Sequence, residues 1–198
     1  MPGFARLVQR PGVSPEAARA CKDRTPRGTV PTTSAVRHVG NDMKALIQRV
    51  LRGRVTVDGK EVGAVGRGFV VLLGVKAGDT EQDARHLAEK TAALRVFADA
   101  HDKMNLSLRE VNGGALVISQ FTLYADTRKG NRPSFVAAAA PADAERLYER
   151  YLEHLRRLLG PERVAAGVFG ARMCVELVND GPVTIELSTD HRPAPSVP

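Results

Sequence analysis

The segment Asn179-Asp180-Gly181-Pro182-Val183-Thr184 lies between two stretches that have the composition of β-strands. Larger apolar side chains alternate along residues 172–178, and residues 183–187 are rich in β-branched side chains, both typical of strands. Proline fixes φ and lacks an amide donor, while glycine tolerates backbone angles that other residues avoid. The Gly181-Pro182 pair can therefore aim bare carbonyl groups, or it can form an ordinary turn between two strands.

Length and composition indicate one soluble globular domain. The chain has 198 residues, of which 43% are hydrophobic and 26% are charged, as is usual for soluble proteins with a single core. No apolar run approaches the roughly 20 residues needed to cross a bilayer, so we expect no membrane association. The two cysteines, Cys21 and Cys174, are far apart in the sequence. This spacing favours a reduced, cytoplasmic protein without disulfides or a zinc site.

The two ends of the chain differ in composition from its centre. Residues 1–42 hold several prolines and glycines and no sustained apolar period, so we expect an N-terminal extension that is disordered or wrongly assigned to the protein. An organelle-targeting segment would share its arginine content, although its acids and prolines disfavour that interpretation. The folded domain is expected over residues 43–190, followed by a disordered tail over 191–198. The extension carries +4 of the net charge of +7, so the charge permits RNA binding without requiring it.

The apolar periodicity predicts an α/β (α+β) fold: a compact single domain of antiparallel-rich β-sheets covered on one face by two main helices. The first helix should run from Glu81 to Phe97 after a cap at Asp79 or Thr80, and the second from Pro141 to Leu159. Polar loops are expected before residue 112 and over the basic segment 125–134. Strands are predicted at residues 45–50, 54–57, 61–65, 69–75 and 115–121, with a hairpin turn at Asp58-Gly59-Lys60.

Two polar clusters are candidates for chemistry. Ser119, Gln120, Phe121 and Thr122 end a predicted strand and offer two hydroxyls and an amide, which can donate to an oxyanion but cannot act as a general base. These groups could equally satisfy nearby backbone atoms. The densest basic cluster beyond residue 42 is either a solvated loop or a phosphate-binding site; it consists of Arg128, Lys129 and Arg132.

Other catalytic classes are poorly supported. Two of the five histidines lie in the expected tails and two on exposed helix faces, so none has the setting of a triad base. His101 lies beside Asp99 and Asp102 in a polar loop, but further ligand spacing is missing and a solvated turn is favoured over a metal site. We expect neither a metal nor a cofactor.

Five separated motifs together resemble those of the D-aminoacyl-tRNA deacylase family, and they extend from Met43 to about Ser188. The resemblance implies a homodimeric enzyme with a β/β/α fold that hydrolyses the ester bond of D-aminoacyl-tRNA and so proofreads chirality. Glycyl-tRNA mischarged on tRNA(Ala) is an expected second substrate. The motifs are residues 43–50, Ser119–Thr122, Lys129–Phe135, Gly167–Ala171 with Met173, and Asn179–Thr184.

The resemblance also implies roles for single residues. A cis Gly181-Pro182 peptide would reach into the partner subunit's active site and reject L-amino acids by collision. Arg49 would orient that peptide, and Met173 would form part of the pocket wall. Amides near Gln120 and Phe121 would bind the oxyanion with help from the 2′-hydroxyl of the tRNA, and a direct role of Thr122 is the alternative. Two rival functions remain: a non-catalytic RNA-binding protein, and a serine or threonine esterase for small esters.

Overall fold

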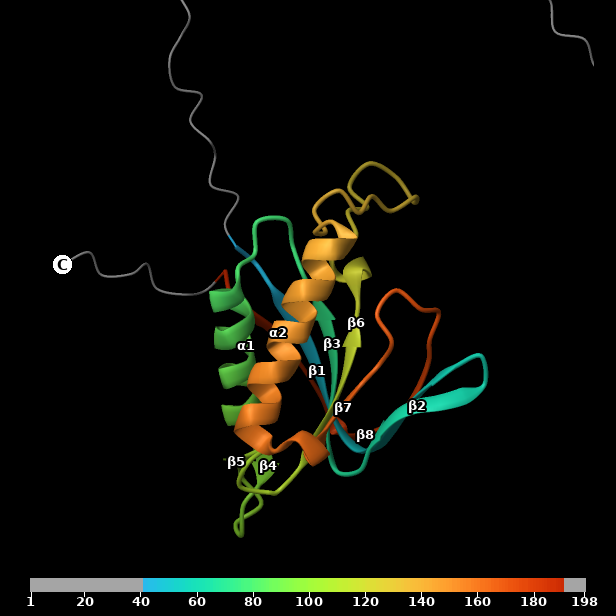
Figure 1. Ribbon diagram of the computed structural model, residues 1–198. Helices are drawn as coiled ribbons and strands as arrows, with labels where there is room; N and C mark the ends of the chain where they lie inside the picture. Colours follow the sequence, from blue (N-terminus) through green and yellow to red (C-terminus); the bar gives the residue numbers. More distant parts are fainter. Residues whose placement is uncertain (1–40, 191–198) are drawn as a thin grey trace, which may run out of the picture. The chain divides into compact units, whose positions relative to one another are not determined.

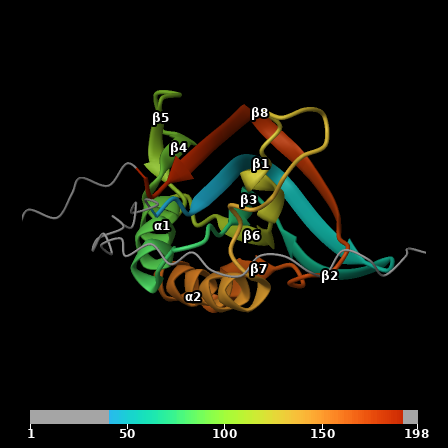
Figure 2. The same ribbon diagram turned by 90° about the horizontal axis from the view of Figure 1, so that it is seen from above.

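The computed structural model describes residues 41–190, in which a mixed sheet carries two helices on one face (Figures 1 and 2). The strand order is β2-β1-β3-β6-β7, and β8 pairs with β1. The β3–β6 and β6–β7 pairs are parallel and the other pairs are antiparallel, which confirms the predicted fold class. The strands of this sheet are β1 (Lys44–Val57), β2 (Lys60–Val65), β3 (Gly68–Gly74), β6 (Gly114–Ser119), β7 (Val164–Ala166) and β8 (Cys174–Ser188).

The expectations for residues 1–40 and 191–198 lie outside the described part of the chain. Two residues assigned to the extension, Asn41 and Asp42, make contacts with the domain. The Asn41 side chain donates to the Asp83 carboxylate at 2.8 Å, and the Asp42 amide donates to the Asp79 carboxylate at 2.9 Å. The ordered contacts therefore begin before Met43. No helix within residues 41–190 has the length and apolar character required to cross a membrane.

The two helices begin as predicted, but only the second ends where expected. Helix α1 (Glu81–Ala93) starts after Thr80, whose amide donates to the Asp83 carboxylate at 2.8 Å, and helix α2 (Pro141–Leu159) has proline in its first turn. The prediction that α1 continues to Phe97 is wrong. Residues Arg95–Ala98 form strand β4, which pairs with β5 (Met104–Ser107) in a region predicted as a loop.

The early end of α1 has a tertiary cause. Phe97 is fully buried, and its ring stacks on Phe69 of β3 with the centroids 5.1 Å apart. Burying an aromatic ring outweighs a few residues of helix propensity, so the chain becomes extended at Leu94. Helical periodicity alone does not reveal this contact with Phe69.

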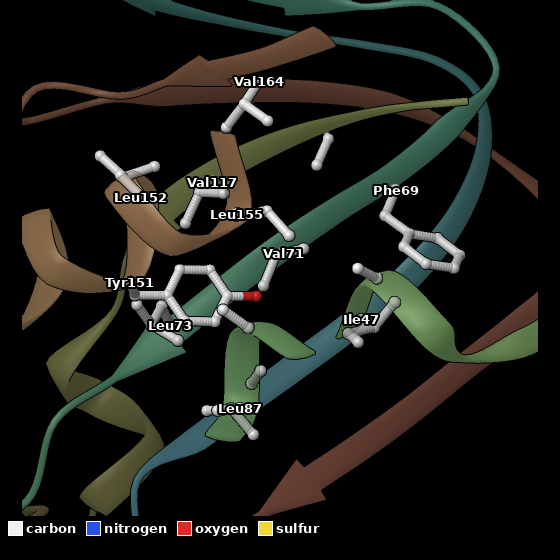
Figure 3. Close-up of a cluster of buried hydrophobic side chains, with 14 of the residues drawn as sticks. Ile47, Phe69, Val71, Leu73, Leu87, Val117, Tyr151, Leu152, Leu155 and Val164 are labelled. Atoms are coloured by element: carbon white, nitrogen blue, oxygen red, sulfur yellow. The ribbon is translucent and has the colours of Figure 1, made fainter. Parts of the chain in front are cut away.

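The main core lies between the helices and the sheet (Figure 3). Tyr151 of α2 is completely buried there, and its hydroxyl donates to the Thr91 hydroxyl of α1 at 2.8 Å. This hydrogen bond ties the two helices together inside an otherwise apolar layer. Figure 3 shows side chains from β1, β3, β6, β7 and both helices meeting in this cluster: Ile47, Phe69, Val71, Leu73, Leu87, Val117, Tyr151, Leu152, Leu155 and Val164.

A second, smaller core lies on the opposite face of the sheet. It is built on Val50, Val55, Val70, Leu116 and Ile118, with partly buried side chains of β8 packed against it. The two cores give the layered arrangement expected for a β/β/α fold. Strand β1 contributes to both because it is one continuous strand, whereas the sequence predicted two strands, 45–50 and 54–57. The interruption predicted at residues 51–53 is wrong, because β1 continues through them. The ladder with β8 instead shifts register between Gln48 and Val50 and between Val50 and Arg52.

The segment that opened the sequence analysis is a bulge within one strand. In the β1–β8 ladder, Gln48 pairs with Thr184 and Val50 pairs with Asn179. Two steps along β1, from Gln48 to Val50, therefore correspond to five steps along β8, from Thr184 to Asn179. Residues 180–183 are displaced from the ladder. Because both halves of β8 pair with the same strand, the alternative of a corner between two separate strands is wrong.

Candidate active site

The predicted polar segment lies where β6 ends. Ser119 is the last residue of the strand, and Phe121–Tyr124 form the short 3₁₀ helix η1 rather than the end of a longer strand. The Gln120 amide donates to the Leu73 carbonyl at 2.7 Å. This bond extends the β3–β6 pairing by one residue and sets the point at which η1 begins.

Tyr124 fastens the other end of η1. Its hydroxyl donates to the carbonyl oxygens of Asp42 at 2.8 Å and Gly74 at 3.1 Å, and its burial raises the pKa of the phenol. A side chain at position 74 would place its Cβ only 2.9 Å from the tyrosine ring. Glycine at position 74 therefore permits the close approach that holds η1 against the sheet.

A cavity of about 560 Å³ opens beside this segment. Phe121 is 58% exposed at its rim, and its ring meets Phe135 edge-on with the centroids 5.0 Å apart. The walls come from β3, the end of β6, the start of α2 and the segment before β8. They include the predicted residues Ser119, Gln120, Phe121 and Met173. They also include Phe135, Tyr148 and Phe169, to which the sequence analysis assigned no role.

Among residues 41–190, the cavity wall contains no candidate for a general base. Its one titratable side chain among the described residues is Tyr148, whose hydroxyl donates to the Val117 carbonyl at 2.9 Å and whose pKa is raised by burial. Of the described histidines, none lines the cavity. The Asp99 carboxylate beside His101 accepts the amides of His101 and Lys103 at 2.8 and 3.1 Å, so it shapes the β4–β5 turn.

Backbone amides at the rim are hydrogen-bond donors of the kind that stabilise an oxyanion. The Gln120 amide is already bonded to Leu73, but the amides of Phe121 and Thr122 belong to the first turn of η1, where a helix offers no internal acceptor. The Gln120 side-chain amide donates to the Thr122 hydroxyl. Of the two amides expected to bind an oxyanion, Phe121 is therefore the one that is available.

Arg49 is placed under the β8 bulge. Its side chain is only 12% exposed, and its Nε donates to the Asp180 carbonyl at 3.1 Å and lies 3.1 Å from the Asp180 carboxylate. Its Nη1 donates to the Val96 carbonyl of β4. Through this arginine, the bulge is linked to the hairpin that the sequence analysis did not predict.

Gly181 and Pro182 lie at the exposed crest of the bulge. The peptide between them is cis, and Gly181 has a φ of 125°, a conformation that favours glycine. A Cβ at this position would come within 2.8 Å of the Val183 side chain and 3.1 Å of the Arg49 guanidinium. Within one chain, neither residue lines the cavity beside Phe121, and neither does Arg49.

The predicted basic loop extends from the rim of the cavity. Asp126 and Ser134 exchange backbone hydrogen bonds of 2.8 and 2.9 Å and so close the loop at its base. Arg128 pairs with the Asp126 carboxylate at 2.6 Å, which holds the pKa of that carboxyl at about 2. Lys129 and Arg132 are exposed, and within residues 41–190 neither forms an ion pair.

A family model described as D-Tyr-tRNA(Tyr) deacylase matches residues 46–188. The D-aminoacyl-tRNA deacylase of Heliobacterium modesticaldum is 59% identical over 143 residues, which cover 72% of this chain and 94% of that relative. The D-aminoacyl-tRNA deacylase of Geobacter sulfurreducens is 57% identical over 150 residues, which cover 76% of this chain and 97% of that relative.

A solved structure shows the same fold. The structure of the c-Myc DNA Unwinding Element Binding Protein superposes with a TM-score of 0.70 at 45% sequence identity, covering 73% of this chain and 97% of that chain.

Proposed function

This chain belongs to the D-Tyr-tRNA(Tyr) deacylase family, and from this premise we propose how it cleaves its substrate. The protein is a D-aminoacyl-tRNA deacylase, a hydrolase that cleaves a carboxylic ester. The observation that carries the proposed mechanism is the rim of the cavity, where uncharged donors surround an apolar space and the described part of the chain supplies no general base.

The proposed reaction is direct hydrolysis of the ester. Water attacks the acyl carbon, and the bond from that carbon to the ribose oxygen of the terminal adenosine breaks, which releases the D-amino acid and free tRNA. The Phe121 amide donates to the carbonyl oxygen as negative charge develops on it, which is where a fixed donor lowers the barrier most. The adjacent 2′-hydroxyl of the tRNA relays the proton of the water to the leaving oxygen, so the enzyme needs neither a base nor a cofactor.

The apolar cavity suits the terminal nucleoside of the tRNA. A volume of about 560 Å³ lies within the usual range for small-ligand sites, and aromatic walls favour stacking on a base. Lys129 and Arg132 of the neighbouring loop would hold backbone phosphates. The hydrogen bond from the Gln120 side-chain amide to the Thr122 hydroxyl would keep the rim in place.

Selection against L-amino acids is assigned to the β8 bulge of a partner subunit. The exposed Gly181 and Pro182 carbonyls would face the Phe121 rim of the other chain in a homodimer. An L-residue would direct its side chain at these carbonyls, whereas a D-residue would direct it away. Glycine has no side chain to collide, so glycyl-tRNA mischarged on tRNA(Ala) is proposed as a second substrate.

The test compares D-tyrosyl-, L-tyrosyl- and glycyl-tRNA as substrates for the wild type and an Arg49→Lys variant. We expect the wild type to cleave the D-tyrosyl and glycyl forms only. Lysine cannot bond the Asp180 and Val96 carbonyls as a fork, so the preference for D- over L-tyrosyl-tRNA should fall about tenfold. Arg54→Lys is the matched control, since Arg54 lies on the same strand but pairs with exposed Glu176 at 2.8 Å.

The rival functions give different results in the same assays. A non-catalytic RNA-binding protein would bind tRNA and release no amino acid. An esterase that uses a hydroxyl nucleophile would cleave small esters and be labelled covalently by a serine-directed inhibitor. Either Ser119→Ala or Thr122→Ala would then abolish the labelling. Intact glycyl-tRNA under conditions that clear D-tyrosyl-tRNA would remove the glycine proposal alone.

A further inference from the structure

A single side-chain amide closes the base of the β8 bulge. The Asn179 Oδ1 accepts the Val183 amide at 2.9 Å, and the Asn179 Nδ2 donates to the Gln48 Oε1 at 2.6 Å. Gln48 itself is paired in register with Thr184. The first bond ties one end of the bulge to the other, and the second ties both ends to β1.

The bulge needs such bonds because the β1–β8 hydrogen bonds do not determine its conformation. Residues 180–183 have no register partner on β1, so the strand pairs on either side leave the height and tilt of the crest open. Adjacent residues of a strand direct their side chains to opposite faces. Gln48 therefore holds the base of the bulge from one face of β1, while Arg49 holds the Asp180 carbonyl from the other.

We propose that Asn179 and Gln48 are positioning residues that set the preference for D- over L-substrates. They do so by fixing the direction of the Gly181 and Pro182 carbonyls without touching substrate. This inference rests on the proposed role of those carbonyls in chiral selection. Loss of the Asn179–Gln48 pair should let the crest move and admit L-residues, while the Phe121 rim and its chemistry stay unchanged.

The chemistry of the pair defines the variants. Gln48→Met keeps the length of the side chain but removes the acceptor, whereas Gln48→Glu keeps an acceptor for the Asn179 Nδ2. Asn179→Ala removes both bonds. The matched controls break cross-strand pairs of β1 and β8 on either side of the bulge: Lys44→Met removes the 3.1 Å pair with Glu186, and Arg54→Met removes the 2.8 Å pair with Glu176.

The first readout is the ratio of kcat/KM for D-tyrosyl-tRNA to that for L-tyrosyl-tRNA. We expect this ratio to fall at least tenfold in Gln48→Met and Asn179→Ala, through faster cleavage of the L form. It should stay within twofold of the wild type in Gln48→Glu, Lys44→Met and Arg54→Met. An unchanged ratio in folded Gln48→Met and Asn179→Ala proteins overturns the inference.

The second readout is hydrogen exchange of the Val183 amide, which needs no substrate. Exchange should accelerate at least tenfold in Asn179→Ala, while the amide of Ile185 in the paired part of β8 keeps its protection. Faster Val183 exchange with an unchanged D/L ratio would overturn the positioning role and leave the proposed function standing. A wild type that cleaves both tyrosyl forms equally would overturn chiral selection itself, and this inference with it.

Discussion

At the scale of single residues, the proposed chemistry depends on the backbone amide of Phe121. Proline at this position would remove the amide, and the place of Phe121 as the first residue of η1 is compatible with proline. We expect Phe121→Pro to lower kcat about 100-fold relative to Phe121→Ala, as for loss of one oxyanion donor. Phe121→Ala controls for the lost ring in single-turnover assays. Equal rates for the two variants would exclude the amide.

The three basic residues of the 125–134 loop should contribute unequally to tRNA binding. Arg128 is already paired with Asp126, while Lys129 and Arg132 have exposed charges. Each phosphate contact to a single strand contributes about 0.7 to the slope of log affinity against log salt concentration. Lys129→Ala and Arg132→Ala should each reduce that slope by about this amount, and Arg128→Ala by less. Filter binding at several salt concentrations measures the slopes, and three equal effects would contradict this assignment.

At the scale of elements, η1 is held by the Tyr124 hydroxyl. Tyr124→Phe leaves the Asp42 and Gly74 carbonyls without this donor. The free energy of unfolding, measured in urea, should therefore fall by about 1–2 kcal/mol. Because η1 carries the Phe121 amide, kcat for D-tyrosyl-tRNA should also fall, with little change in KM. Tyr151→Phe is the matched control, since its buried hydroxyl joins the two helices. It should lose similar stability and keep kcat; an equal loss of kcat in both variants would point to general destabilisation.

At the scale of the whole molecule, the active site is proposed to be shared between two subunits. Mixing two variants to form mixed dimers tests this directly. The Arg49→Lys subunit has an intact cavity and a loosened bulge. Excess Phe121→Pro supplies an inactive cavity and an intact bulge. If the bulge acts across the interface, mixed dimers should cleave D-tyrosyl-tRNA and stop cleaving L-tyrosyl-tRNA.

The alternative gives the opposite outcome. If each bulge serves its own chain, cleavage of L-tyrosyl-tRNA per Arg49→Lys subunit will not change when Phe121→Pro is added after joint refolding. Sedimentation of the wild type gives the assembly state independently, since one chain has a mass of 21.3 kDa. A monomer that nonetheless discriminates D from L would exclude the shared site.

Several elements were predictable because their signals are local. Pro141 and Gly160 bracket helix α2, and Asp58 and Gly59 both adopt positive φ in the turn between β1 and β2, as the hairpin pattern indicated. The polar segment Ser119–Thr122 was correctly placed where β6 ends. These features follow from the conformational limits of a few adjacent residues, which a sequence displays directly.

Other features depend on partners far away in the chain. Strand β4 replaces the end of a predicted helix because Phe97 packs on Phe69. The continuity of β1 depends partly on Gly53, where a Cβ would lie 2.6 Å from the Val70 side chain. No local pattern announces either contact, since each requires strands from separate parts of the chain to lie together.

The sequence by itself determined the class of fold, the second helix and the motifs that mark the family, because periodicity, capping residues and motif order are properties of the linear chain. Only the tertiary structure decided that Asn179–Thr184 form a bulge and that Arg49 and Asn179 hydrogen-bond to it. It also decided that the Gln120 backbone amide donates to the Leu73 carbonyl. Those outcomes depend on which strand lies beside which, and in what register. Arg49 and Asp180, like Gln48 and Asn179, are 131 positions apart in the sequence, and they come together only when the sheet forms.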